Sequence, residues 1–271
     1  MNYALSCIPK NKGILSKSIN FLNNLSYHKE CFCSLIFYSH FFKNYRYGVQ
    51  SNRKTNYSTQ SDNQNSEKSE NQSNNDKLPP LMNFPKVIWP SLGKTIKNYI
   101  LTTFIIKPYL DNDFNMAEVV LGSKKAVDVV SNKLSLGEIK TLDGLVASDI
   151  IPSLQARLSI MSLAQREQLS ISERDIYFSF PYQVGIIFDD DDNSEQKRFV
   201  EITMVHHSLK GLSAMRARGE EIPMNIGLIP EYRDKISIAN YRFIKEFKKG
   251  VESDWTINLM NHFRPSDEMD E

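Results

Sequence analysis

The residues best suited to chemistry are few and scattered along the chain. A histidine pair, His206-His207, lies in an apolar run, and four consecutive aspartates occupy positions 189 to 192. Imidazole and carboxylate groups bind metal ions and transfer protons in proteins. Because adjacent strand residues point to opposite faces, the two imidazoles cannot share one metal ion. The aspartates lack the glycine and the terminal glutamate of an EF-hand loop, so we interpret them as a solvated hairpin tip.

The motifs of common enzyme classes are absent from the sequence. It holds no phosphate-binding loop, no nucleophile elbow, no His-Glu-x-x-His zinc motif and no cysteines in zinc-finger spacing. The pairs Glu173/Asp175 and Glu220/Glu221 carry groups for acid–base catalysis, but nothing places them in one pocket, and we interpret them as exposed charges. We therefore predict a non-enzymatic protein with no catalytic residues, no cofactor and no metal site.

The start of the chain differs in charge from the remainder. The 271 residues include 33 basic and 32 acidic side chains, yet Glu30 is the only acid in residues 1–60. A basic, acid-poor, Ser/Asn-rich start is typical of a mitochondrial transit peptide. The alternative, a secretory signal or membrane anchor at Cys31–Phe42, is only 12 residues long, whereas a membrane-spanning helix needs about 20. We expect residues 1–50 to be a transit peptide and the mature protein to reach the mitochondrial matrix.

The next segment has the composition of a linker. Residues 51–78 are rich in Asn, Ser and Gln and nearly free of aliphatic side chains, so they bury too little apolar surface to offset the entropy of ordering. All three cysteines precede this linker, and the predicted domain therefore has no disulfide framework. We expect a disordered linker at 51–78, a peptide- or protein-binding domain at 79–265, and an acidic tail at 266–271.

Helical periodicity dominates the first part of this domain. Apolar residues and one serine recur at the spacing of a single helix face, at Met116, Val120, Ser123, Val127, Val130 and Leu134. Asn115 is positioned to cap this helix. Ser135 and Glu138 predict the cap of a second helix that runs to Leu145, with Gly137 in its first turn. A third helix follows Asp149 and carries the apolar stripe Leu154, Leu158 and Met161.

The period changes to two after Ile171. Apolar side chains alternate through residues 177–188, which predicts a long half-buried strand, and Pro181 marks an edge, a bulge or a bend in it. Further strand-like runs lie at 196–209, 222–233, 236–247 and 255–263. Helices followed by hairpin-linked strands predict an α+β fold in which N-terminal helices pack on a curved antiparallel sheet.

Two surfaces are candidates for binding. The alternating row Phe178, Phe180, Tyr182 and Val184 is a candidate wall for a peptide pocket in the concavity of the sheet. The alternative is that this row simply packs against the helices. Acidic residues at the pocket mouth would suit a basic presequence.

The other candidate surface is the segment that precedes the predicted helix beginning at Met116. A helix at Leu92–Ile106, ending before Pro108, is predicted either to dock on the domain or to lie on a membrane surface. Its candidate membrane-contact residues are Trp89, Lys97, Ile100 and Phe104. Basic residues form no stripe interleaved with aromatics, so we predict no direct nucleic-acid recognition.

Several short segments carry a family resemblance. They read FPKVIWPSL, KPYLDNDFN, AVDVVSNKLS, LDGLVASD and GVESDWTI, and their most specific residues are Tyr109, Asp111, Phe114, Asp254 and Trp255. In order and spacing they resemble the mitochondrial m-AAA protease-interacting protein family over residues 84–263. The chain departs from that family in its long Asn/Ser linker and its acidic hairpin tip.

The resemblance implies a cone-shaped, nuclear-transport-factor-like domain, similar in fold to the C-terminal domain of the import-motor membrane subunit. It implies a matrix protein at the inner membrane that associates with m-AAA protease subunits. It also implies that the protein binds the precursor of the calcium uniporter's regulatory subunit (EMRE) and protects it from degradation until its presequence is processed. An alternative is an inner-membrane-associated scaffold that tethers the mitochondrial ribosome or import machinery. A third is an enzyme, which requires a histidine or aspartate deep in the pocket.

Overall fold

The structure is a computed structural model that describes residues 77–189, 197–223, 226–247 and 253–268. The predicted transit peptide, all but the last two residues of the predicted linker, and the aspartates at 190–192 lie outside these ranges.

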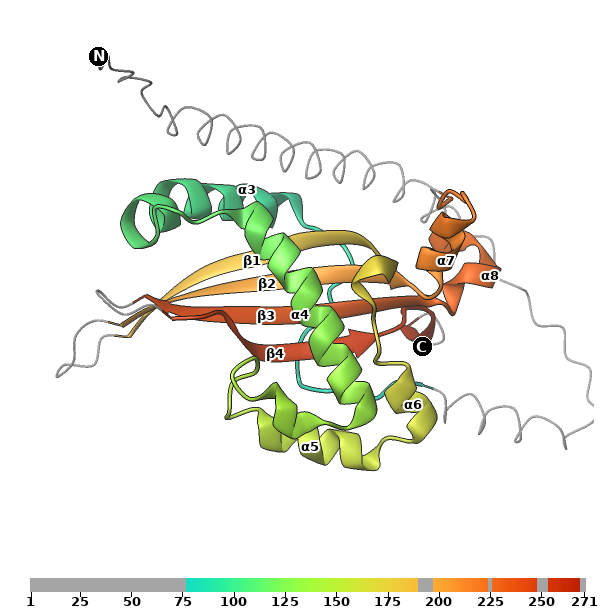
Figure 1. Cartoon of the computed structure of the whole chain (residues 1–271). Helices are drawn as coiled ribbons and strands as arrows, with labels where there is room; N and C mark the ends of the chain where they lie inside the picture. The colour runs from blue at the N-terminus through green and yellow to red at the C-terminus, as the bar shows by residue number, and fades with distance from the viewer. Residues whose placement is uncertain (1–76, 190–196, 224–225, 248–252, 269–271) are drawn as a thin grey trace, which may run out of the picture.

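Four antiparallel strands form a single sheet in the order β1-β2-β3-β4 (Figure 1). The strands are β1 (Ile176–Asp189), β2 (Lys197–Leu209), β3 (Ile236–Phe247) and β4 (Thr256–Phe263). Each strand pairs with the next one in the sequence, so β1 and β4 are the edges of the sheet. The predicted α+β fold with an antiparallel sheet is confirmed.

One predicted strand is wrong. Residues 222–233 contain a 3-10 turn at Ile226–Leu228 and the short helix α8 (Pro230–Arg233) instead. Pro230 lacks the N–H that a strand ladder uses, but it fits the first turn of a helix. Between β2 and this segment lies another short helix, α7 (Leu212–Ala217).

Helix α4 (Met116–Leu136) lies across one face of the sheet (Figure 1). All six residues of its predicted face are buried, and Asn115 caps the helix by accepting a hydrogen bond from the Ala117 N–H at 3.0 Å. The face packs with the inward side chains of the sheet in the main core, whose strand members include Val184, Ile202, Met204, Ala239 and Tyr241.

The end of α4 corrects the prediction of a second capped helix. Gly137 is the C-cap, with a φ of 77°, and is not the first turn of a new helix. The Glu138 N–H bonds to the Lys133 carbonyl at 2.9 Å, which satisfies one of the last carbonyl groups of α4. After this cap the chain forms only a 3-10 turn, Ile139–Leu142, and Leu145 is exposed.

Two helices follow. α5 (Ile151–Ile160) buries Leu154 and Leu158, and Met161 just after its end is also buried, as predicted. Its N-cap is Ile150 and not the predicted Asp149. α6 (Leu163–Glu167) begins with a capping box formed by Ser162 and Gln165, which the sequence analysis missed.

The first helix extends further than predicted. α3 (Leu92–Leu101) continues as a π-helix, Thr102–Leu110, which includes Pro108. At its end the Asp111 N–H donates to the Ile106 carbonyl at 2.9 Å, five residues back. A proline disrupts the hydrogen bonding of an α-helix, and here the wider π-type turns carry the chain past it.

Residues 78–90, here called the strap, begin in the main core with Leu78 and Leu81 and then cross the second face of the sheet (Figure 1). Val87 of the strap packs in a separate apolar cluster with Phe180, Val205, Ile238 and Phe263. The sheet is therefore covered on both sides, by α4 on one face and by the strap on part of the other.

Candidate functional site

The predicted peptide-contact row does not lie on a single face. The register of β1 against β2 shifts between Pro181 and Gln183. Before the shift, Phe180 pairs with Val205 and packs under the strap, together with Phe178 and Tyr182. After the shift, Val184 pairs with Ile202 and packs in the main core under α4. After the shift, the other set of alternate β1 residues faces the main core. The predicted row is therefore divided between two cores.

The strap is held by polar side chains that rise from the sheet. The His207 Nε2 lies 2.7 Å from the Ile88 carbonyl oxygen, and the Asn240 Nδ2 donates to the Pro85 carbonyl at 3.1 Å. The Asn261 Oδ1 accepts from the Leu81 N–H at 3.1 Å. All three sheet residues are buried. This face of the sheet therefore binds the main chain of an extended segment, whatever the side chains of that segment are.

Beyond the strap the same face carries an open groove of about 310 Å³. Its floor is a row of paired residues that crosses all four strands, from Gln183 on β1 through Thr203 and Arg242 to Leu259 on β4. Gly185 extends the floor, and a Cβ atom added there would meet no atom within 4 Å. The rim is formed by strap and α3 residues, including Phe84, Pro85, Val87 and Lys94.

Polar contacts organise the groove. The Arg242 Nε donates to the Asn258 Oδ1 at 2.9 Å and lies 3.4 Å from the Glu201 Oε1, and the Asn258 Nδ2 donates to the same carboxylate at 2.9 Å. On the rim, the Lys94 Nζ donates to the Gln183 Oε1 at 2.9 Å. The charged lining residues are Lys94, Arg242 and Glu201, two cations and one carboxylate, so the lining has a net charge of +1.

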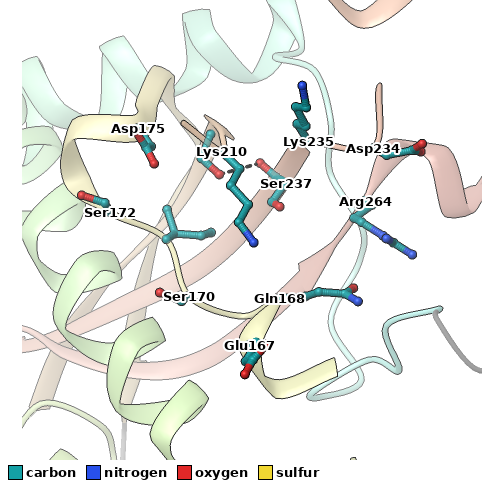
Figure 2. Close-up of a pocket in the computed structure, with 12 residues that line it drawn as sticks. Glu167, Gln168, Ser170, Ser172, Asp175, Lys210, Asp234, Lys235, Ser237 and Arg264 are labelled. Atoms are coloured by element: carbon teal, nitrogen blue, oxygen red, sulfur yellow. Dashed lines mark hydrogen bonds between the residues drawn. The ribbon is translucent and has the colours of Figure 1, made fainter. Parts of the chain in front are cut away.

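A second hollow, of about 130 Å³, lies where β2 ends and β3 begins (Figure 2). Lys210 extends across it, whereas Lys235 and Asp234 point away. Its lining contains three cations and three carboxylates, so they balance. Asp175 is already engaged, because its carboxylate accepts the Ser213 N–H at 2.8 Å. This hollow is smaller than the groove and has no net charge to select a ligand.

The two histidines predicted to face opposite sides do so. His207 lies under the strap, whereas His206 lies under α4 with its Nδ1 2.8 Å from the Ser179 Oγ. Burial lowers the pKa of His206 to about 3 and that of His207 to about 4, so both are neutral at physiological pH. The partner of His206 is a hydroxyl, and neither histidine lines either hollow, where the enzyme alternative requires a histidine or aspartate.

The candidate membrane-contact residues separate into two groups. Lys97, Ile100 and Phe104 are exposed on α3 and the π-helix, with Ile100 47% and Phe104 61% accessible. Trp89 belongs to the strap and is half-buried, with its ring 5.4 Å from the ring of His207. Among the described helices, none is long and apolar enough to cross a membrane.

The residues that carry the family resemblance are spread over one side of the main core. Phe114 is buried and Trp255 is half-buried, and both pack in that core. Asp111 accepts the Asp113 N–H and lies 3.9 Å from the Lys245 Nζ, whereas Tyr109 and Asp254 are exposed. In the part of the chain that the structure describes, no three His, Cys, Asp or Glu residues are grouped to hold a metal ion.

Of the predicted peptide-contact residues, Tyr182 lines the groove, whereas the polar residues of its floor were not predicted. An alternating pattern assigns three of these lining residues, Gln183, Glu201 and Arg242, to the solvent-facing side of their strands. One signal was present, because an isolated glycine inside a strand, here Gly185, often marks a place where another backbone approaches closely.

Comparison with known proteins confirms the resemblance to the m-AAA protease-interacting proteins. The chain is 27% identical over 162 residues to rat "m-AAA protease-interacting protein 1, mitochondrial", covering 59% of this chain and 54% of the relative. The human protein of the same name is 26% identical over 165 residues, covering 60% and 55%. The bovine protein is 25% identical over 163 residues, covering 59% and 55%. The chain thus spans about half the length of the curated relatives it matches.

No family model matches the chain. No solved structure matches it either, so its predicted likeness in fold to cone-shaped, nuclear-transport-factor-like domains stays a prediction.

Proposed function

We propose that this chain is a non-enzymatic adaptor of the mitochondrial matrix that associates with the m-AAA protease. It binds the precursor of the calcium uniporter's regulatory subunit (EMRE) and protects that precursor from degradation until its presequence is processed. The client is held in an extended form on the open face of the sheet and is not chemically changed there.

The observation that carries this proposal is the similarity to relatives named for their interaction with the m-AAA protease. The basic, acid-poor start of the chain supports a mitochondrial destination. The groove supports a holding role, because it offers open polar sheet surface beside a segment that the same face already binds. The two hollows offer no histidine for acid–base chemistry, which favours binding over catalysis.

The test is affinity purification of the tagged full chain from mitochondrial matrix extract. We expect both protease subunits and the uniporter-subunit precursor in the bound fraction. In cells that lack the chain, the precursor should be degraded before processing. A bound fraction that contains neither the protease nor the precursor would overturn the proposal.

A second function is supported by the surface of α3. Leu92, Ile96, Ile100 and Phe104 are all at least 47% exposed on one continuous helical segment, with Lys97 exposed among them. An amphipathic segment with apolar residues and lysines is suited to the surface of an anionic membrane. In this second proposal the chain is a peripheral inner-membrane scaffold that tethers the mitochondrial ribosome or import machinery, and flotation with liposomes tests it.

A further inference from the structure

We propose that the groove binds an extended polypeptide segment that is neutral or acidic. This segment lies beside the strap and crosses the strands in the same direction as the strap. This inference rests on the proposed adaptor function and deepens it, because it assigns the binding site and the chemistry of the bound segment. The segment it assigns is not a basic presequence.

The strap shows how this sheet face holds an extended chain. Across β2, β3 and β4, one polar side chain from each strand bonds to the strap backbone, at His207, Asn240 and Asn261. These contacts use main-chain N–H and C=O groups, which every polypeptide has. A second segment can therefore be held in the same way by the next polar residues along the same strands.

The groove supplies those residues. Gln183, Thr203 and Arg242 lie side by side on β1, β2 and β3, on the face that carries the strap. Arg242 uses its Nε–H on Asn258, and a guanidinium group has four further N–H donors for carbonyl or carboxylate groups. Gly185 leaves the floor open where a larger side chain would fill it.

Geometry sets the length of the bound segment. Four strands at a spacing of about 4.8 Å span roughly 14–19 Å, and an extended chain rises about 3.3 Å per residue, so about five or six residues cross the sheet. The floor row ends at Leu259, an apolar contact for one side chain near the end of the segment.

Charge selects the chemistry of the segment. Glu201 is already bonded to Asn258 and close to Arg242, whereas the partners of Lys94 among the described residues, Gln183 and Tyr182, are neutral. The net positive lining attracts carboxylates and repels lysine and arginine. The lining holds one carboxylate, Glu201, against two cations, so this groove suits an acidic segment better than a basic presequence. The adaptor holds a part of its client that lies outside the presequence.

The test uses the full chain and fluorescein-labelled peptides of about six residues, composed of Ser, Val and Thr with two Asp, or with two Lys in their place. Binding is followed by fluorescence anisotropy at low and at high salt. We expect the Asp peptide to bind, the Lys peptide to bind more weakly, and the difference to shrink as salt rises.

Two matched variants locate the site. Gly185→Phe fills the groove, and Gly122→Phe makes the same change at an open glycine on α4, in the other layer. Both replace a glycine that weakens its element, so both variants should fold, which circular dichroism checks. We expect Gly185→Phe to weaken Asp-peptide binding about tenfold or more, because the ring occupies the groove, and Gly122→Phe to leave it unchanged.

Three results would overturn the inference: no binding of the Asp peptide by the wild-type chain, tighter binding of the Lys peptide, or equal binding by Gly185→Phe and wild type. The proposed function fails separately. If the tagged wild-type chain recovers the protease and the precursor from extract while the peptide assay fails, the adaptor role stands and the groove is not its site.

Discussion

Asn98 on α3 accepts a hydrogen bond from the Val184 N–H of β1 through its Oδ1, at 2.8 Å and 86 residues away in the sequence. The Nδ2 of the same side chain donates to the carbonyls of Pro181 and Tyr182, at 3.3 and 3.2 Å. These strand groups lie where the β1–β2 register shifts beside Gln183. One buried side-chain amide thus gives hydrogen-bond partners to backbone groups of the edge strand β1 where its pairing with β2 is irregular. The same contacts join α3 to the rim of the groove.

Asn98→Ala should lower the free energy of unfolding by about 1–3 kcal/mol, because it leaves buried strand groups without hydrogen-bond partners. Urea unfolding followed by circular dichroism measures the change. Lys97→Ala, on the exposed side of the same helix, is the control and should change stability little. Equal stability of the two variants would contradict the role assigned to Asn98.

Gly137→Ala should destabilise the protein by about 1 kcal/mol, because an alanine adopts the left-handed conformation only at a cost. A Cβ at this position would also lie 3.2 Å from the Arg166 Nη1. Gly122→Ala, inside the same helix and with open space around it, should instead stabilise by up to about 1 kcal/mol. Thermal unfolding of the two variants measures the direction in which each Tm changes. A change of Tm in the same direction for both variants would refute this account.

Stability should fall as the solution is acidified below about pH 6.5. Burial lowers the pKa of His206 to about 3, and those of His207 and His262 to about 4, from 6.5 in the unfolded chain. Between these values the unfolded chain binds more protons, so the free energy of unfolding rises with pH, by up to about 1.4 kcal/mol per pH unit for each histidine.

Urea unfolding at a series of pH values above pH 5, where most carboxylates stay ionised, measures this slope. His207→Gln removes one titrating group and should flatten the slope by about a third if the three histidines contribute equally. A free energy of unfolding that stays constant from about pH 6.5 to 5 would show that the histidines are not buried as neutral groups.

Ile100→Asp and Phe104→Asp test the membrane surface. Both side chains are exposed, so each substitution should leave the free energy of unfolding within about 0.5 kcal/mol of wild type. If the chain floats with liposomes that contain an anionic lipid, each aspartate should abolish that flotation. Absence of flotation by the wild-type chain would remove the scaffold proposal and leave the adaptor proposal untouched.

The hydrophobic pattern of the sequence was sufficient to predict an element where a single helix or strand period ran along its whole length. The α4 face was predicted residue by residue, because Met116 to Leu134 keep a single helical period against one apolar surface. The bounds of β3 were predicted to the residue for the same reason. Prediction failed at Gly137, where capping and first-turn positions look alike in sequence, and at 222–233, where the apolar residues belong to short turns that pack only in the folded chain.

The groove could not be predicted from pattern. Its residues come from four strands, α3 and the strap, and only the strand register aligns Gln183 with Thr203 and Arg242. The shift at Pro181 also decides which side of the sheet each aromatic of β1 reaches, and beside it the Val184 N–H donates a hydrogen bond to Asn98 of α3, 86 residues earlier in the sequence.

Periodicity and composition in the sequence alone determined the α+β class, the buried face of α4 and the family resemblance. These features depend on interactions between near neighbours in the chain, or on residue types. Only the tertiary structure decided that the predicted peptide row is divided between two faces, with Tyr182 at the groove and Val184 in the main core, and that the open surface lies beside the strap. The physical reason is that a one-residue change in register exchanges the two faces of a strand, and register is set by partners distant in sequence.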